Sequence, residues 1–120
     1  MVTQYAERQD TVFRALADPT RRDILSLLRA GEQPVNTIAR GFPVSRPAIS
    51  KHLRLLLDAE LVYERREGRN RLYQLNAQPL KSVDEWLEEY RTLWQRKLKD
   101  LKRYLEAPKK EEAKHGPHNR

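Results

Sequence analysis

The segment from Val44 to Val62, VSRPAISKHLRLLLDAELV, presents side chains that can recognise a base pair on one edge of a predicted helix. Ser45 is the expected cap, and Ile49, Leu53 and Leu56 face inward at helical spacing. The opposite face then carries Arg46, Pro47, Ser50, Lys51 and Arg54. Arginine can bind guanine through two hydrogen bonds, serine can donate or accept one, and lysine can reach a base or a phosphate. The pattern therefore predicts a helix that enters the major groove of DNA.

A cationic hairpin is predicted directly after this helix. The apolar spacing changes from about 3.6 to about 2 after Ala59, so LVYERR and RLYQLN are expected to be strands joined at EGRN. Gly68 suits the turn. Four arginines cluster around it, namely Arg65, Arg66, Arg69 and Arg71. Beside a helix in the major groove, this hairpin is expected to lie against phosphates or in the neighbouring minor groove.

The positive charge of the chain is concentrated around these two elements. The 120 residues have a net charge of +7, and residues 36–76 alone hold eight basic and four acidic side chains. A localised basic patch favours a polyanionic partner. Charge by itself fits a solvated basic face equally well, so DNA binding is inferred from the spacing of the polar residues as well.

Three shorter helices are expected to support the base-reading segment. The first, over residues 9–18, turns Val12, Phe13, Leu16 and Ala17 inward. Asp18 suits the cap of the second helix, Pro19 suits its first turn and Gly31 suits its end. The second helix carries a wide apolar stripe and is expected to be central to the core. The third is predicted over residues 33–42.

The last predicted helix is too long for so small a domain to cover. It runs from Pro79 to Ala107 without an internal glycine or proline, and about 1.5 Å per residue makes it about 40 Å long. Most of its apolar residues recur at steps of three and four, namely Leu80, Val83, Leu87, Tyr90, Trp94, Leu101 and Tyr104. Pairing with the same helix of a second subunit is the expected solution. The alternative is an aromatic pocket for an apolar effector.

No pattern in the chain predicts an enzyme or a metal site. Ser50 and His52 are two residues apart on a helix and do not face each other, and the carboxylates of the long helix are expected to be solvated. There is no cysteine. Arg21 and Arg22 are expected to hold nearby carboxylates or to cover the helix surface with their stems. We expect neither a catalytic residue, a metal nor a cofactor.

Residues 1–107 are expected to form one domain for DNA binding and dimerisation, followed by a disordered charged tail over residues 108–120. His115 and His118 in the tail fall short of the three or four ligands of a zinc site. No apolar run approaches the roughly 18 residues that span a bilayer, and the N-terminus lacks an apolar signal core. A cytoplasmic location without membrane association is therefore expected.

Three blocks of the sequence resemble the ArsR/SmtB-type winged helix-turn-helix repressors. They are FRALADPTRRDILSLL, SRPAISKHLRLLLDAELV and RREGRNRLYQL, in continuous order over residues 9–76. The resemblance implies a mainly α fold with a small β-hairpin, and a homodimer paired through its first and last helices on a near-palindromic operator. The residues expected at the dimer interface are Phe13, Leu87, Tyr90, Trp94 and Leu101.

The resemblance also implies which residues contact DNA. On the reading helix the family pattern matches Ser45, Arg46, Pro47, Ser50 and Lys51, and at the wing tip it matches Arg66, Arg69 and Asn70. Many metal-sensing members have cysteines where this chain has VNTIARG, and others have ligands along a last helix that here lacks histidine. The chain is therefore similar to the metal-free branch of the family, and no effector is identified.

The sequence thus predicts a homodimeric, sequence-specific transcriptional repressor of its own or an adjacent operon. One alternative is a MarR-like regulator that responds to a ligand bound at an aromatic dimer seam. A second alternative is a winged-helix module whose basic face docks an acidic protein. A gel shift on the upstream region separates DNA recognition from protein docking.

Overall fold

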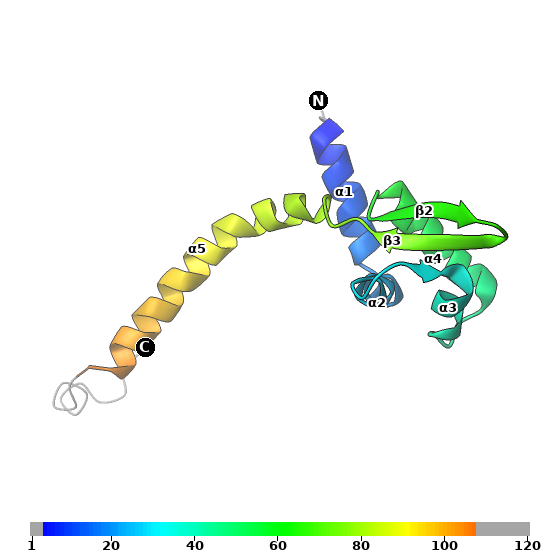
Figure 1. The fold of residues 1–120 in the computed structure, drawn as a ribbon. Helices are drawn as coiled ribbons and strands as arrows, with labels where there is room; N and C mark the ends of the chain where they lie inside the picture. The colour runs from blue at the N-terminus through cyan, green and yellow to red at the C-terminus, as the bar shows by residue number, and fades with distance from the viewer. Residues whose placement is uncertain (1–3, 108–120) are drawn as a thin grey trace. The chain divides into compact units, whose positions relative to one another are not determined.

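The structure, a computed structural model, describes residues 4–107, which form five helices and a three-stranded sheet (Figure 1). The elements in chain order are α1 (Gln4–Leu16), α2 (Pro19–Leu28), β1 (Gln33–Pro34), α3 (Val35–Arg40), α4 (Arg46–Asp58), β2 (Val62–Glu67), β3 (Asn70–Leu75) and α5 (Leu80–Leu105). This mainly α fold with a small hairpin confirms the predicted fold class. Among the described helices, none has the length and apolar character needed to cross a membrane.

Each of the two central helices begins at the cap that the sequence indicates. The Asp18 carboxylate accepts a hydrogen bond from the Arg21 backbone N–H at 3.0 Å, and Pro19 occupies the first turn of α2. The Ser45 hydroxyl likewise accepts from the Ala48 N–H at 3.2 Å at the start of α4. These caps fix where α2 and α4 begin.

A short strand that no sequence pattern predicts completes the sheet. The order is β1-β3-β2, with β1 antiparallel to β3 through the pairs Gln33–Tyr73 and Pro34–Leu72. Two residues are too few to show an alternating apolar pattern, and proline at a sheet edge needs no backbone N–H for pairing. Residues 33–34 were expected within the third helix, which instead begins at Val35.

The first helix differs from its prediction in length and in the face that it buries. It begins at Gln4 instead of near Gln9, and Ala15 is buried whereas Ala17 is exposed. The helix ends at Leu16, so Ala17 no longer follows helical periodicity. Val12 is buried as expected.

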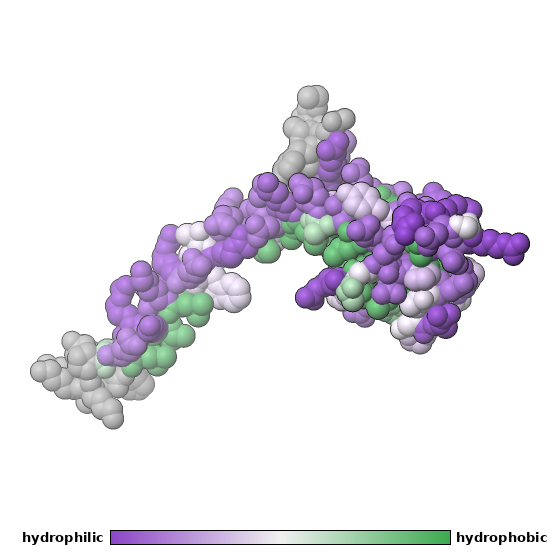
Figure 2. Space-filling model, viewed as in Figure 1, coloured by the Kyte–Doolittle hydropathy of each residue, from purple (hydrophilic) through white to green (hydrophobic). Residues whose placement is uncertain are grey.

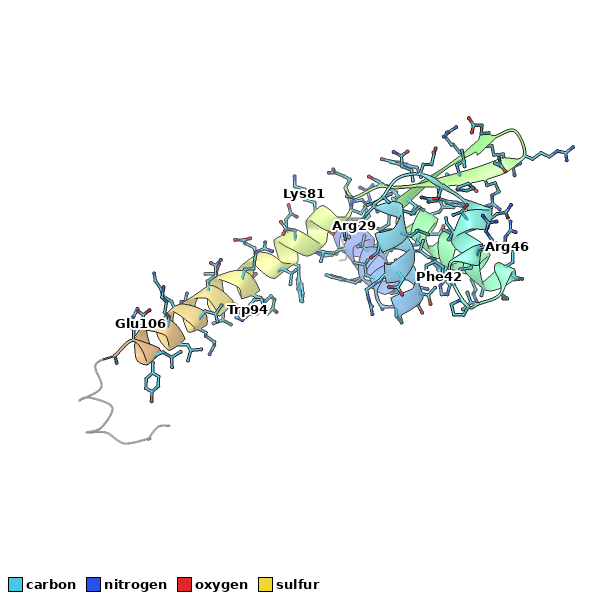
Figure 3. All side chains as sticks on the ribbon, turned by 60° about the horizontal axis from the view of Figure 1, so that its bottom comes forward. Arg29, Phe42, Arg46, Lys81, Trp94 and Glu106 are labelled. Atoms are coloured by element: carbon cyan, nitrogen blue, oxygen red, sulfur yellow. The ribbon has the colours of Figure 1, made fainter. Side chains whose placement is uncertain are left out.

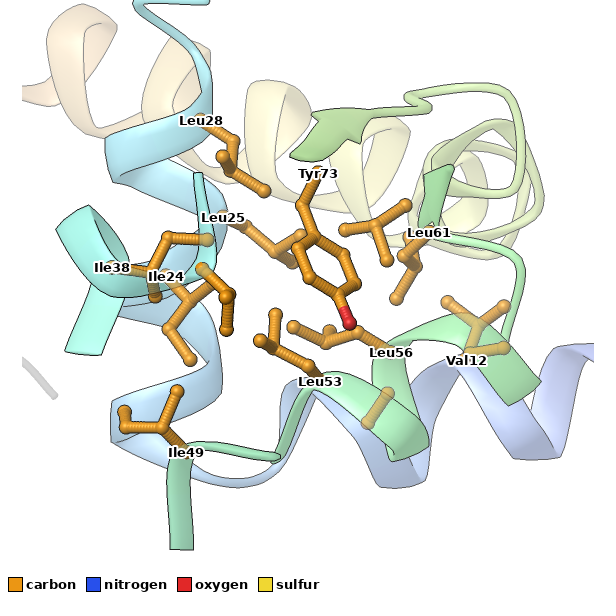
Figure 4. Close-up of a cluster of buried hydrophobic side chains, with 14 residues drawn as sticks. Val12, Ile24, Leu25, Leu28, Ile38, Ile49, Leu53, Leu56, Leu61 and Tyr73 are labelled. Carbon is orange, nitrogen blue, oxygen red and sulfur yellow. The ribbon is translucent and has the colours of Figure 1, made fainter. Parts of the chain in front are cut away.

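One apolar core joins α1–α4 to the hairpin. The ring of Tyr73, which is 1% exposed, lies among leucine side chains from α2, α4 and the start of the hairpin (Figure 4). The inward residues of α4, namely Ile49, Leu53 and Leu56, are all buried as predicted. Burying a leucine or isoleucine contributes about 1.5–3 kcal/mol, so these three side chains hold α4 firmly to the domain.

The described residues divide into two compact units between Asp84 and Glu85. In the first unit, Leu80 and Val83 pack against the core. The second unit contains the remainder of α5, where no residue is buried.

Candidate nucleic-acid interface

The α4 side chains predicted to contact DNA are all exposed, namely Ser45, Arg46, Pro47, Ser50, Lys51 and Arg54. Figure 3 shows Arg46 projecting away from the domain at the start of α4. Within residues 4–107, no ion pair holds Arg46, Lys51 or Arg54. The cationic groups on this helix face are therefore free to bind an anionic ligand without first breaking a protein contact.

Helices α3 and α4 form a helix-turn-helix. They contact each other across the turn of residues 41–45, and α4 also packs against α2 and β2. Because the buried side of α4 is held by several elements, its exposed side is presented rigidly.

The wing is a tight hairpin whose tip carries three of the predicted contact residues. Strands β2 and β3 pair in register from Val62–Leu75 to Glu67–Asn70. The two-residue turn begins with Gly68 at φ +63°, which suits a tight hairpin. Arg66, Arg69 and Asn70 are exposed at this end of the hairpin.

The four wing arginines differ in whether a carboxylate of the described residues holds them. Arg65 donates two hydrogen bonds of 2.8 Å to the Glu32 carboxylate, and Arg71 contacts the Glu64 carboxylate at 2.6 Å. Hydrogen bonds from Arg65 lower the pKa of Glu32, so this pair stays ionised at neutral pH. Within the described residues, Arg66 and Arg69 have no such partner.

A buried tyrosine anchors the Arg71–Glu64 pair to the core. The Tyr73 hydroxyl donates to Glu64 Oε2 at 2.9 Å and accepts from Arg71 Nη2 at 2.7 Å. Burial, together with the bond to Glu64, raises the pKa of Tyr73 to about 12. Partial burial opposes ionisation of Glu64, but the hydrogen bonds from Arg71 and Tyr73 outweigh it and lower the pKa of that carboxyl. Arg71 and Glu64 therefore stabilise the wing.

Arg21 joins the end of α1 to the reading helix. Its guanidinium donates to the Ala15 carbonyl at 2.8 Å, to the Arg14 carbonyl at 3.0 Å and to His52 Nδ1 on α4 at 3.2 Å. Arginine has no acceptor atom, so this last bond requires an unprotonated Nδ1 on His52. Asp18 Oδ2 lies 3.8 Å from the same nitrogen.

Arg21 and Arg22 have structural contacts, as expected, but their side chains bind backbone carbonyls where one of the two expectations was a carboxylate. Arg22 donates to the Leu16 carbonyl at 2.7 Å, and Arg21 binds carbonyls and a histidine as described above. The carbonyls at the end of α1 lack partners within the helix, which makes them strong acceptors for a nearby guanidinium. No pattern in the sequence reveals that α1 ends against these two arginines.

The predicted dimer residues lie on α1 and on the exposed part of α5. Phe13 is half-buried, whereas Leu87, Tyr90, Trp94 and Leu101 are 37–66% exposed. Figure 2 shows that the apolar side chains of α5 form a band along one side of the helix, with the charged residues on the other. Exposed apolar side chains that gather in one band often mark a surface that contacts another molecule. Among residues 4–107, no three potential metal ligands lie together.

Known proteins are similar to this chain in both sequence and fold. The helix-turn-helix domain family matches residues 16–65. The transcriptional repressor SdpR of Bacillus subtilis is 41% identical over 78 residues, covering 65% of this chain and 87% of SdpR. The HTH-type transcriptional regulator Rv2034 of Mycobacterium tuberculosis is 43% identical over 89 residues, covering 74% and 80% of the two chains. The crystal structure of the ArsR family transcriptional regulator RHA00566 superposes with a TM-score of 0.70 at 35% identity, covering 78% and 97%.

Proposed function

This chain belongs to the ArsR family of winged helix-turn-helix transcriptional repressors, and we propose that it represses transcription as a homodimer bound to a near-palindromic operator. The observation that carries the proposal is the cationic face of α4, which is exposed and, within residues 4–107, free of ion pairs, while its opposite apolar face is buried. An operator that overlaps a promoter of the chain's own or an adjacent operon would exclude RNA polymerase.

In this proposal α4 lies in the major groove. Arg46 reads a guanine edge, Ser50 and Lys51 reach neighbouring bases or phosphates, and Arg54 binds the backbone. Ser45 and Pro47 fix the start of the helix against the duplex, and the α4 amides near Ser45 face a phosphate. Cationic contacts to phosphate supply most of the affinity and make it sensitive to salt.

The second copy provides the second reading helix. Two α4 helices related by a two-fold axis enter successive major grooves about 34 Å apart. Phe13 and the exposed band of α5 form the dimer interface in this proposal, because dimerisation removes the band from water. Residues 1–107 then constitute the DNA-binding and dimerisation domain, and the predicted tail of residues 108–120 lies outside the described residues.

No catalytic step, metal or cofactor enters the proposed function, and we place the protein in the cytoplasm with the DNA that it binds. A small-molecule effector could act by changing the angle between the two reading helices. It would need to favour one dimer conformation by only a few kcal/mol.

Footprinting of the upstream region tests the proposal. We expect the purified protein to protect two half-sites separated by one helical turn, because the two-fold axis places both α4 helices on the same side of the duplex. A duplex with scrambled half-sites provides the control, and its binding should be weaker by about 10³-fold or more. Equal binding to both duplexes would contradict sequence-specific repression and favour a non-specific or protein-docking role.

The division of the wing arginines gives a second expected result. Replacing Arg66 and Arg69 together with alanine should reduce the salt dependence of operator binding, by about 1 in the slope of log K against log salt for each phosphate that an arginine no longer neutralises. The matched variant replaces Arg65 and Arg71, which removes the same charge from the same hairpin. Because Arg65 and Arg71 are held by carboxylates, their removal should lower thermal stability more and the slope less. Equal slope changes in the two variants, measured by salt titration, would overturn this assignment.

A further inference from the structure

His52 joins the reading helix α4 to α2 through a hydrogen bond that its protonated form cannot make. The Arg21 Nη1 group donates to His52 Nδ1 at 3.2 Å. Arginine has no acceptor atom, so Nδ1 must be the acceptor, and the single proton of the neutral ring lies on Nε2. The side chain of His52 is 19% exposed, which shields this bond from most of the solvent. His52 follows Lys51 directly, so its position also affects a side chain that is proposed to contact DNA.

Arg21 is itself held in place by the end of α1. Its Nε donates to the Ala15 carbonyl at 2.8 Å, and its Nη2 donates to the Arg14 carbonyl at 3.0 Å. Both carbonyls belong to the last turn of α1, where they have no partner within the helix. A planar guanidinium with three hydrogen bonds has little freedom to move, so it determines where His52 Nδ1 must lie.

The bond from Arg21 adds a direction that the apolar contacts of α4 lack. Ile49, Leu53 and Leu56 hold the helix to the core, but apolar attraction is non-directional. A hydrogen bond weakens steeply when its angle departs from linearity. We therefore expect this bond to limit small rotations of α4 about its own axis, which would change the direction in which its exposed side chains project.

Protonation of His52 exchanges one partner at the start of α2 for another. With a hydrogen on Nδ1, the ring presents a donor and a positive charge to Arg21, and the bond between them is lost. Asp18 Oδ2 lies 3.8 Å from Nδ1, near enough to attract the imidazolium but too far for a hydrogen bond. The ring must therefore move away from Arg21 and toward Asp18. The hydrogen bond from the Arg21 backbone N–H lowers the pKa of Asp18, so its carboxylate stays charged while histidine titrates.

Arg21 and Asp18 are the charged groups that face His52 within the part of the chain that the structure describes. Both come from the start of α2, whereas α1 contributes backbone carbonyls through Arg21. Among residues 4–107, no side chain of α1, α3 or the hairpin forms a hydrogen bond or an ion pair with His52. The neighbouring Lys51 on α4 is exposed. The exchange of partners therefore depends on the protonation of His52 alone.

We propose that Arg21 and His52 are positioning residues for operator recognition, and that α4 is in its reading orientation while His52 is neutral. The inference rests on the proposed repressor function and adds the contacts that orient the reading helix. Neither side chain needs to contact DNA. Because coupling between two binding equilibria is reciprocal, protonation of His52 should weaken the preference for the operator, and operator binding should oppose protonation of His52.

The first experiment follows the proton on His52 by NMR in the full-length protein. The chain has three histidines, and replacing His115 and His118 with asparagine leaves the ring signals of His52 alone. We expect His52 to titrate at a pH lower by about 0.5–1 unit in the complex with the palindromic duplex, which corresponds to a three- to tenfold coupling. A histidine that only contacts phosphate would titrate at a higher pH in the complex, because the negative charge of DNA attracts its proton. An unchanged or higher midpoint would overturn the role of His52.

The second experiment measures operator preference, the ratio of affinities for the palindromic and the scrambled duplex, at about pH 8 and about pH 5.5, on either side of the range in which histidine titrates. The ratio cancels the general gain in attraction to DNA in acid, and for the wild type it should fall three- to tenfold. His52→Asn places an amide oxygen close to the position of Nδ1, so it can accept from Arg21 without titrating. This variant should keep the wild-type ratio at about pH 8 and lose the pH dependence. The variant without His115 and His118 should keep both, and the reverse pattern would contradict the proposal.

The third experiment compares two adjacent arginines of α2. Arg21→Lys keeps the charge but cannot span His52 and the two α1 carbonyls, so at about pH 8 its operator preference should be three- to tenfold below the wild type and insensitive to acid. Arg22→Lys is the matched control, because Arg22 donates to the Leu16 carbonyl at the same end of α1 and has no bond to α4. Thermal unfolding verifies that both variants fold, and the NMR titration needs neither of them. Equal preference and equal pH response in the two variants would overturn the role of Arg21.

The outcomes separate this inference from the proposed function. A wild type that binds the palindromic and the scrambled duplex equally at about pH 8 would contradict sequence-specific repression itself. A wild type that prefers the operator at about pH 8, with no effect of acid or of these variants, would overturn only the inference about Arg21 and His52.

Discussion

Replacing Arg46 and Lys51 together with alanine is expected to remove most of the specific operator binding. Both side chains are exposed on the face of α4 opposite its buried residues, and within residues 4–107 neither has an ion-pair partner. Arg46 is expected to bind a base, and Lys51 a base or a phosphate. Removing both groups should weaken the free energy of binding by about 2–5 kcal/mol, which corresponds to a loss of affinity of roughly 30-fold to several thousandfold. The measurement is a titration of the palindromic and the scrambled duplex at fixed salt.

The control for this variant replaces Arg29 and Lys81, two exposed cations outside α4 and the wing. It removes the same net charge, so it should reproduce any general electrostatic loss without loss of specificity. Both double variants should unfold at nearly the wild-type temperature, because the replaced side chains are exposed. Retention of operator preference by the Arg46 and Lys51 variant would refute the placement of α4 in the groove.

Replacing Trp94 and Leu101 together with glutamate is expected to produce a monomer. Trp94 is 66% exposed and Leu101 is in the same apolar band, so the charges would be buried only if the dimer formed. A monomer carries one reading helix, and absence of the second removes a gain of about 10²–10⁴ in operator affinity from bivalent binding. Sedimentation and operator titration measure the two effects separately.

Thr92 and Gln95 provide a matched control, because both lie on the charged side of α5. Their replacement with glutamate adds the same charge to the same helix and should leave the dimer intact. Binding to a single half-site should be similar for the wild type, the control and the monomeric variant. Weak half-site binding by the Trp94 and Leu101 variant alone would mean that the reading unit had been damaged, and an intact dimer would exclude the band as the interface.

The sequence predicted the fold well wherever a local rule determines it. Helical spacing placed Ile49, Leu53 and Leu56 in the core, and side-chain caps placed the starts of α2 and α4. The wing followed from a change in periodicity and a glycine at the turn. These features depend on residues within a few positions of each other, which is the range over which single-sequence patterns are informative.

Contacts between distant segments could not be predicted in the same way. Glu32 and Arg65 are 33 residues apart, and Arg21 and His52 are 31 apart, so no periodicity connects them. The Glu64–Tyr73 pair could have been predicted, because a two-residue turn at Gly68 fixes which residues of the hairpin are opposite each other. The sequence predicted that the contact residues are exposed, but it did not predict the ion pairs of Arg65 and Arg71.

The division of the wing arginines has a consequence for how the protein finds its target in a genome. Every unpaired cation strengthens attachment to any duplex, whatever its sequence. Because Arg65 and Arg71 are paired with Glu32 and Glu64, we expect the hairpin to bind random DNA less strongly than four unpaired arginines would. Shorter residence on the millions of competing sites would leave more molecules free to bind the operator, so we expect these two carboxylates to speed the search without contacting the DNA.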